Sequence, residues 1–107
     1  MYHQLEMIKS HEVFPGFHGR FVHSDKMTLA FWEIQKGSSV PEHDHFHEQV
    51  VNMLEVEFEL VVDGVPRVLS HGMVVIIPSH VRHSGTAITD CKILDVFSPV
   101  REDYVFK

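Results

Sequence analysis

Cysteine is almost absent from this chain, which has one, Cys91, among 107 residues. An intrachain disulfide is therefore excluded, and a lone cysteine fits a reducing compartment. No apolar run approaches the ~20 residues that a membrane-spanning helix needs. The first residues, Met1 to Glu6, also lack the basic and apolar regions of a secretory signal. Together these absences predict a cytoplasmic protein.

Positive charge is scarce as well. Nine lysines and arginines stand against 15 acidic residues, for a formal net charge of −6. Without a basic stripe, neither nucleic acid nor an anionic membrane is expected as a partner. The length predicts one domain over residues 1–107. Because so small a domain buries only a modest share of its surface, we expect a homodimer in which a second copy covers an apolar face.

Long helical patterns are missing, and short apolar runs alternate with turn residues instead. Residues 55–62 alternate cleanly between apolar and acidic, Asp63-Gly64 is a strong hairpin signal, and residues 65–69 form the returning strand. Further strands are expected over residues 27–36, 50–54, 73–77, 81–88 and 92–97, with a short one at 104–106. The wholly apolar run at 73–77 predicts a strand buried on both faces, and only a weak helical segment precedes Val13. The pattern predicts an all-β fold.

Histidine is abundant, and the stretch from His43 to Gln49 holds three histidines and a glutamine. Imidazole nitrogens are the commonest protein ligands for divalent transition metals. His43 and His45 are one residue apart, which suits an extended segment whose alternate side chains point the same way. His47 shares this parity and competes with Gln49 as a further ligand. The stretch predicts a metal held by β structure.

A second group of motif residues follows the hairpin. Gly72 is followed after five residues by Pro78, and His83 comes five positions later, with His80 between them. Two strand-borne halves separated by a hairpin would bring His83 beside His43 and His45, as a metal site requires. His80 is a candidate by proximity only. The remaining histidines are expected at the surface: His3, His11, His18, His23 and His71.

These two groups make the chain resemble a single-domain cupin from about residue 28 to residue 104. The first cupin motif is matched by Gly37, His43, His45 and Gln49, and the second by Gly72, Pro78 and His83. The resemblance implies a cupin-type double-stranded β-helix, or jelly-roll barrel. It also implies one divalent metal on His43, His45, Gln49 and His83. Zinc, nickel, manganese, iron and copper all accept such imidazole-rich sites.

Four positions depart from the family pattern without removing a ligand. They are Val56 and His80 in place of motif glycines, Met73 in place of an aspartate, and His71 in place of a proline. A position that needs a positive φ favours glycine. We therefore expect altered loop geometry near Val56 and His80.

Gln49 stands where a carboxylate is common, and this changes the expected chemistry. Its amide oxygen is neutral and takes no proton at working pH. Three imidazoles and an amide leave the full charge on the metal, which favours Lewis-acid polarisation of a bound oxygen. The carboxylate of the two-histidine triad of iron oxygenases is missing.

Asp95 offers a base from outside the ligand set. It shares a strand face with Ile93 and Phe97, and an aspartate among apolar neighbours is a candidate for a perturbed pKa. The alternative is an Asp95 that pairs with Arg101 or caps a turn, with Phe97 as plain core. Both readings are open on spacing alone.

The late run Asp95-Val-Phe-Ser-Pro-Val-Arg101-Glu-Asp, together with the histidine stretch, is similar to small cupins of the pectin-degradation type. Those proteins convert unsaturated uronic acids into linear keto sugars. The resemblance implies Asp95 as acid and base, Phe97 shaping the pocket, and Arg101 binding the carboxylate of a small-molecule substrate. Competing hypotheses are a cupin-type dioxygenase with a redox metal and a non-catalytic sugar- or metal-binding module. The dimer interface is expected around Phe31 and Trp32.

Overall fold

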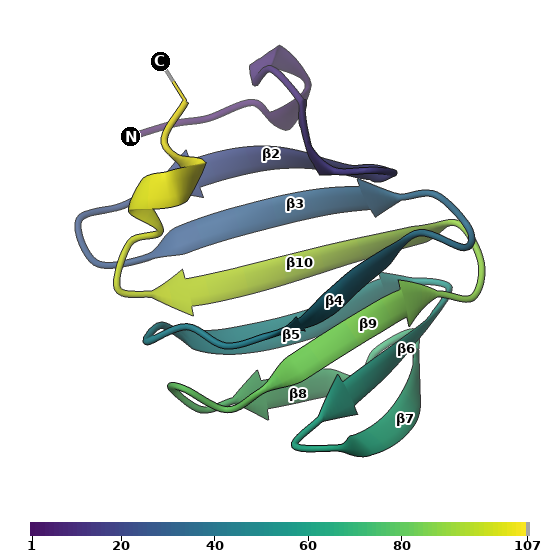
Figure 1. Cartoon of the computed structure of the whole chain (residues 1–107). Coiled ribbons are helices and arrows are strands. Elements are labelled where there is room, and N and C mark those ends of the chain that lie inside the picture. Colours follow the sequence, from purple (N-terminus) through teal and green to yellow (C-terminus); the bar gives the residue numbers. More distant parts are fainter. Residues whose placement is uncertain (107) are drawn as a thin grey trace.

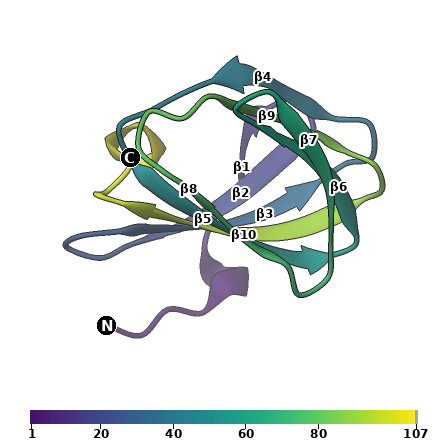
Figure 2. The same ribbon diagram turned by 90° about the horizontal axis from the view of Figure 1, so that it is seen from below.

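The protein is described by a computed structural model over residues 1–106, in which ten strands form two antiparallel sheets. The six-stranded sheet has the order β1 (His11–Phe14), β2 (Phe17–His23), β3 (Thr28–Ile34), β10 (Cys91–Ser98), β5 (Glu48–Glu55), β8 (Val74–Ile77). The four-stranded sheet has the order β4 (Ser39–His43), β9 (His83–Ala87), β6 (Glu57–Val62), β7 (Val65–Ser70). The sheets lie face to face around one interior (Figures 1 and 2). The predicted all-β fold is confirmed.

The core follows from the alternation of the central strands. In β3, Ala30, Trp32 and Ile34 point inward, and β10 turns Asp95 and Phe97 to the same interior. Each large apolar side chain buried in this way contributes about 1.5–3 kcal/mol to stability. The interior between the sheets is therefore filled mainly by apolar side chains, and buried polar side chains such as Asp95 lie near one end of the barrel.

The predicted hairpin between β6 and β7 is present. Asp63 and Gly64 have φ values of 50° and 78°, and Val62 pairs with Val65 across the turn. Two consecutive positive φ angles are typical of the tight turn that matches the twist of antiparallel strands. His80 also has a positive φ, 65°, at a position where the cupin pattern has glycine.

Two predictions about the elements are wrong, and two strands were not predicted. β8 is not buried on both faces, because it is an edge strand and exposes Val74 and Ile76 by 60% and 63%. The terminal segment forms a 3-10 turn, η2 (Glu102–Tyr104), in place of a strand at 104–106. The weak helical segment expected before Val13 contains a 3-10 turn, η1 (Leu5–Met7), and the strands β1 and β2 that follow it were not predicted. Within residues 1–106, no helix has the length and apolar character needed to cross a membrane.

The outer face of the six-stranded sheet carries apolar side chains in a row. The strand register aligns Val22, Leu29, Val96, Val50 and Ile76 across β2, β3, β10, β5 and β8. Phe31 lies on this face, next to Leu29. Trp32 points into the core and is 5% exposed, so it cannot take part in a dimer interface as expected.

Candidate metal centre and pocket

Three histidines from distant parts of the chain converge at one end of the barrel. His43 ends β4 and His83 begins β9, where the two are paired across the sheet with ring centroids 4.2 Å apart. His45 lies in the connection between β4 and β5, with its ring 5.0 Å from that of His83. One ligand nitrogen of each lies within 4.8 Å of the others. The predicted approach of His83 to His43 and His45 is present, although His45 is in a loop and not on a strand.

Each of the three rings is oriented by a backbone carbonyl. Nδ1 of His43 lies 2.8 Å from Pro41 O, Nδ1 of His45 lies 2.9 Å from His47 O, and Nδ1 of His83 lies 2.9 Å from Val81 O. An Nδ1–H that donates to a carbonyl leaves the lone pair on Nε2. This is the tautomer and the outer-shell support that metal-binding histidines show.

In the part of the chain that the structure describes, two acceptor nitrogens in the cluster have no hydrogen-bond donor, one on His45 and one on His83. Gln49 Oε1 lies 3.1 Å from His45 Nε2, and both atoms are acceptors when His45 donates through Nδ1. His83 Nε2 is buried and has no hydrogen-bond partner among residues 1–106. Burial lowers the pKa of His45 and lowers that of His83 to about 4, so both rings are neutral. These neighbouring lone pairs can be satisfied by a cation, and the set of nitrogen and oxygen donors suits a divalent transition metal.

His47 and His80 do not join the cluster. His47 is buried beside Phe46, and its Nε2 lies 3.2 Å from Val100 O. Its shared parity with His43 and His45 has no effect because residues 44–47 leave the strand. His80 contributes its backbone N–H, which donates to His45 O at 2.8 Å.

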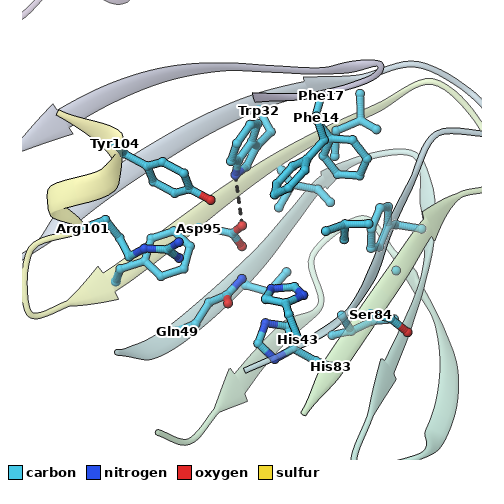
Figure 3. A pocket seen from close by; sticks show the side chains of 18 residues that line it. Phe14, Phe17, Trp32, His43, Gln49, His83, Ser84, Asp95, Arg101 and Tyr104 are labelled. Atoms are coloured by element: carbon cyan, nitrogen blue, oxygen red, sulfur yellow. Dashed lines mark hydrogen bonds between the residues drawn. The ribbon is translucent and has the colours of Figure 1, made fainter. Parts of the chain in front are cut away.

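Asp95 enters the interior from β10 beside Gln49. Its Oδ2 accepts a hydrogen bond from Trp32 Nε1 at 3.1 Å, and its buried Oδ1 has no partner within residues 1–106. The amide nitrogen of Gln49 faces this carboxyl group (Figure 3). Burial raises the pKa of Asp95 to about 7, against the opposing effects of Gln49, Trp32 and Arg101.

Arg101 is held by another carboxylate, so the expected alternative of an Asp95–Arg101 pair is not formed. Arg101 Nε and Nη2 donate to the two oxygens of Asp103 at 2.9 and 2.7 Å. The guanidinium packs against both Phe97 and Tyr104, 4.6 and 4.2 Å from the ring centroids, and the two rings contact each other at 5.9 Å. Both Nη1 hydrogens and one Nη2 hydrogen are left for another ligand.

Comparison with known proteins agrees with this arrangement. The cupin domain family matches residues 30–97. This chain is a cupin. It is 27% identical over 84 residues to the pectin degradation protein KdgF of Dickeya dadantii, covering 77% of this chain and 76% of that protein.

Two solved structures resemble this cupin over nearly its whole length. KdgF from Halomonas sp. shares 25% identity with a TM-score of 0.92, over 98% of each chain. A RmlC-like cupin from Shewanella frigidimarina shares 30% identity with a TM-score of 0.92, over 97% of this chain and 95% of that one. The predicted resemblance to pectin-degradation cupins is therefore confirmed.

The candidate site of this cupin opens on a cavity of about 60 Å³. Polar side chains line one part: His43, Gln49, His83, Asp95, Arg101 and Tyr104 (Figure 3). Aromatic and aliphatic side chains line the remainder. Trp32 and Tyr104 also line the cavity and were not predicted as site residues. A buried tryptophan needs an acceptor for its indole N–H. Asp95 on the neighbouring strand is such an acceptor, and this could have indicated that Trp32 lies at the site.

Proposed function

We propose that this cupin is a metal-dependent isomerase that opens the ring of an unsaturated uronic acid. The observation that carries the proposal is the buried Asp95 carboxyl, set between Gln49 and Trp32 and facing the same cavity as Arg101. The similarity to two KdgF proteins supports it. His43, His45, Gln49 and His83 would hold one divalent metal, whose bound form supplies Lewis-acid polarisation of a substrate oxygen.

Asp95 is proposed as the proton carrier. An unsaturated uronate is a cyclic hemiacetal whose ring oxygen is joined to a carbon–carbon double bond. When the anomeric hydroxyl loses its proton, the anomeric carbon becomes an aldehyde, its bond to the ring oxygen breaks, and the ring oxygen becomes part of an enol. The far carbon of the double bond gains a proton as the enol becomes a ketone. One proton leaves oxygen and one reaches carbon, so the step needs no co-reactant. The unpaired Oδ1 of Asp95, a residue that lines the cavity, is proposed to serve both transfers.

Arg101 is proposed to bind the substrate carboxylate. Asp103 occupies its Nε edge, so the carboxylate is expected at the Nη1 and Nη2 end. Phe97 holds one face of the guanidinium and keeps it directed to the cavity. The cavity of about 60 Å³ is far smaller than the ~300–1,000 Å³ of common ligand pockets, so the sugar acid must lie at the mouth.

A redox-metal dioxygenase is the second candidate function. It is favoured by the apolar inner lining, which includes Phe14, Phe17 and Phe58 and suits an uncharged small molecule such as dioxygen. Histidine-rich sites also accept iron and copper. Oxygen uptake with phenols or diketones, absent with a uronate, would favour this function. A module that only binds a sugar or metal would show binding without turnover of either kind.

The direct test is incubation of metal-loaded protein with an unsaturated monouronate while the absorbance of its double bond is followed. We expect the absorbance to fall with wild type. With Asp95→Asn the rate of this fall should be lower by about 100-fold or more, because a positioned acid or base contributes about 10²–10⁴-fold to a rate. Asp25→Asn is the matched control, since Asp25 is exposed and distant from the cavity. Wild type no faster than buffer would overturn the uronate assignment.

We further propose that the protein is a homodimer paired through the outer face of the six-stranded sheet. The row from Val22 to Ile76 supports this, because it crosses five strands without a charged residue. Oppositely charged pairs, Arg20–Glu33 and Lys92–Glu55, lie on the same sheet. A second copy related by a twofold axis would meet a row like its own.

A further inference from the structure

His23, expected at the surface, is half-buried and joins three segments at the end of β2. Its Nδ1 lies 2.8 Å from Thr28 Oγ1, and its Nε2 lies 3.1 Å from the backbone oxygen of Tyr104. Thr28 Oγ1 also accepts the backbone N–H of Arg101 at 2.9 Å. The β2–β3 hairpin is thereby tied to the turn that carries Arg101 and Tyr104.

The three hydrogen bonds form one chain with a fixed direction. Arg101 N–H donates to Thr28 Oγ1, so the Thr28 hydroxyl hydrogen is free to donate to His23 Nδ1. Nε2 of the same neutral ring then carries the hydrogen and donates to Tyr104 O. A single tautomer satisfies every group, and no other arrangement of a neutral ring does.

Burial and register place this chain close to the candidate site. Thr28 is fully buried, and adjacent strands align His23, Thr28, Phe97 and Gln49 side by side. The turn η2, which follows β10 and Arg101, has three residues, and so short a 3-10 turn has little stability of its own. Its position therefore depends on contacts from outside the turn.

We infer that His23 and Thr28 are positioning residues that hold Arg101 and Tyr104 against the cavity. The inference rests on the proposed function for one point, that Arg101 binds the substrate carboxylate. The guanidinium contacts the ring of Phe97, on the sheet, and the ring of Tyr104, on the turn, and these two rings also contact each other with centroids 5.9 Å apart. A shift of the turn moves one ring relative to the other and so turns the guanidinium away from its place.

Substrate affinity is expected to change more than the rate of the bound complex. Asp95 and Gln49 stand on β10 and β5 and are fixed by the sheet, whereas only Arg101 and Tyr104 move with the turn. Misplacement of a binding group by ~1 Å can cost ~100-fold, so loss of the tether should raise KM by roughly 10-fold or more. The kcat should stay within about 3-fold of wild type on the same argument.

Thr28→Val keeps the shape of the side chain and removes both of its hydrogen bonds, while Thr28→Ser keeps both. His23→Asn retains an acceptor near Nδ1, His23→Gln retains a donor near Nε2, and His23→Ala retains neither. We expect the KM increase in Thr28→Val and His23→Ala, smaller increases in the Asn and Gln variants, and rescue in Thr28→Ser. His18→Ala on the same strand is the matched control, since the one polar contact of its ring within residues 1–106 is with Glu12, at 3.7 Å.

Amide hydrogen exchange over residues 99–106 gives a readout independent of the reaction. Thr28→Val should speed exchange there and leave residues 48–55 of β5 unchanged, with metal content equal to wild type. Unchanged exchange would overturn the tether, and faster exchange with unchanged KM would overturn the positioning role.

If wild type does not convert the uronate, the proposed function fails, but the inference is still decided. Calorimetric binding of galacturonate by metal-loaded wild type and Thr28→Val then replaces KM. Weaker binding in Thr28→Val supports the positioning role. Equal binding, or none by either protein, overturns it.

Discussion

The indole N–H of Trp32 donates to Asp95 Oδ2 at 3.1 Å, from β3 to the neighbouring β10 inside the barrel. One carboxyl oxygen is thereby fixed and the other, Oδ1, is left without a partner among residues 1–106. A structural carboxylate in the core would have both oxygens satisfied. Asp95 thus has one oxygen fixed by Trp32, and its carboxyl group also faces the Gln49 amide.

Trp32→Phe should lower stability and activity together. The variant removes the hydrogen bond that orients Asp95 Oδ2 and leaves part of the indole volume empty, which should cost about 1–3 kcal/mol in the free energy of unfolding. We expect a lower kcat with metal content unchanged. Asp25→Asn, at an exposed position in the connection between β2 and β3, is the control for urea unfolding and turnover. A kcat equal to wild type would show that this orientation of Asp95 is not needed.

Asp95→Asn should stabilise the metal-free protein at high pH. The pKa of Asp95 is raised in the folded state to about 7, above its value in an unfolded chain, so the folded state binds the extra proton. Stability from this group is complete below about pH 4 and is lost as the pH rises through about 7. Urea unfolding with a chelator should show Asp95→Asn about 1–3 kcal/mol more stable than wild type at pH 8, with a smaller difference at pH 5. A difference that does not depend on pH would contradict the buried, protonated carboxyl.

Metal removal should destabilise the wild-type protein. A ligand that binds only the folded state at 100 times its Kd adds about 2.7 kcal/mol, so a chelator should lower Tm clearly. His45→Ala and His83→Ala should lose both the metal and the chelator effect. His3→Ala, at an exposed position, should keep both. Equal metal content in His45→Ala and wild type would refute the ligand assignment.

His80→Gly should increase stability. His80 has a φ of 65°, a left-handed conformation in which a side chain costs about 1 kcal/mol and glycine does not. The greater freedom of glycine in the unfolded chain offsets part of this, so a gain of about 0.5 kcal/mol is expected by urea unfolding. His71→Gly, at an exposed histidine whose φ is not positive, should be destabilising instead.

Ile76→Lys should dissociate the proposed dimer. The mass in solution should be twice 12.4 kDa for wild type and close to 12.4 kDa for the variant, by light scattering. Lysine at the β8 end of the apolar row must lose water to be covered by a second copy. Val65→Lys, equally exposed but on the four-stranded sheet, should remain dimeric. A monomeric wild type would refute the proposal.

Local patterns in the sequence predicted the parts of the fold that depend on neighbouring residues. The alternation in β6 and the Asp63-Gly64 turn each follow from spacing along a single segment. Both faces of the segment 27–36 are partly apolar, so spacing did not predict that Trp32 points inward. The approach of His83 to His43 was also predictable, because it requires only that the two strands carrying the motif histidines pair with each other. These features need no knowledge of what lies on the other side of each strand.

The errors concern contacts that only the assembled barrel decides. The apolar run of β8 does not reveal that the strand lies at a sheet edge with Ile76 outward. Arg101 has carboxylates on both sides in the sequence, and its choice of Asp103 over Asp95 depends on how η2 bends back. His23 resembles any exposed histidine until the turn 81 residues later meets it.

The ligand cluster has a mechanical consequence for a chain that cannot form a disulfide with itself. His43 and His83 belong to the four-stranded sheet, whereas Gln49 belongs to the six-stranded sheet. An ion held by all three would join the two sheets at the open end of the barrel. Metal binding would then act as a reversible cross-link that limits the separation of the two sheets at the open end of the barrel.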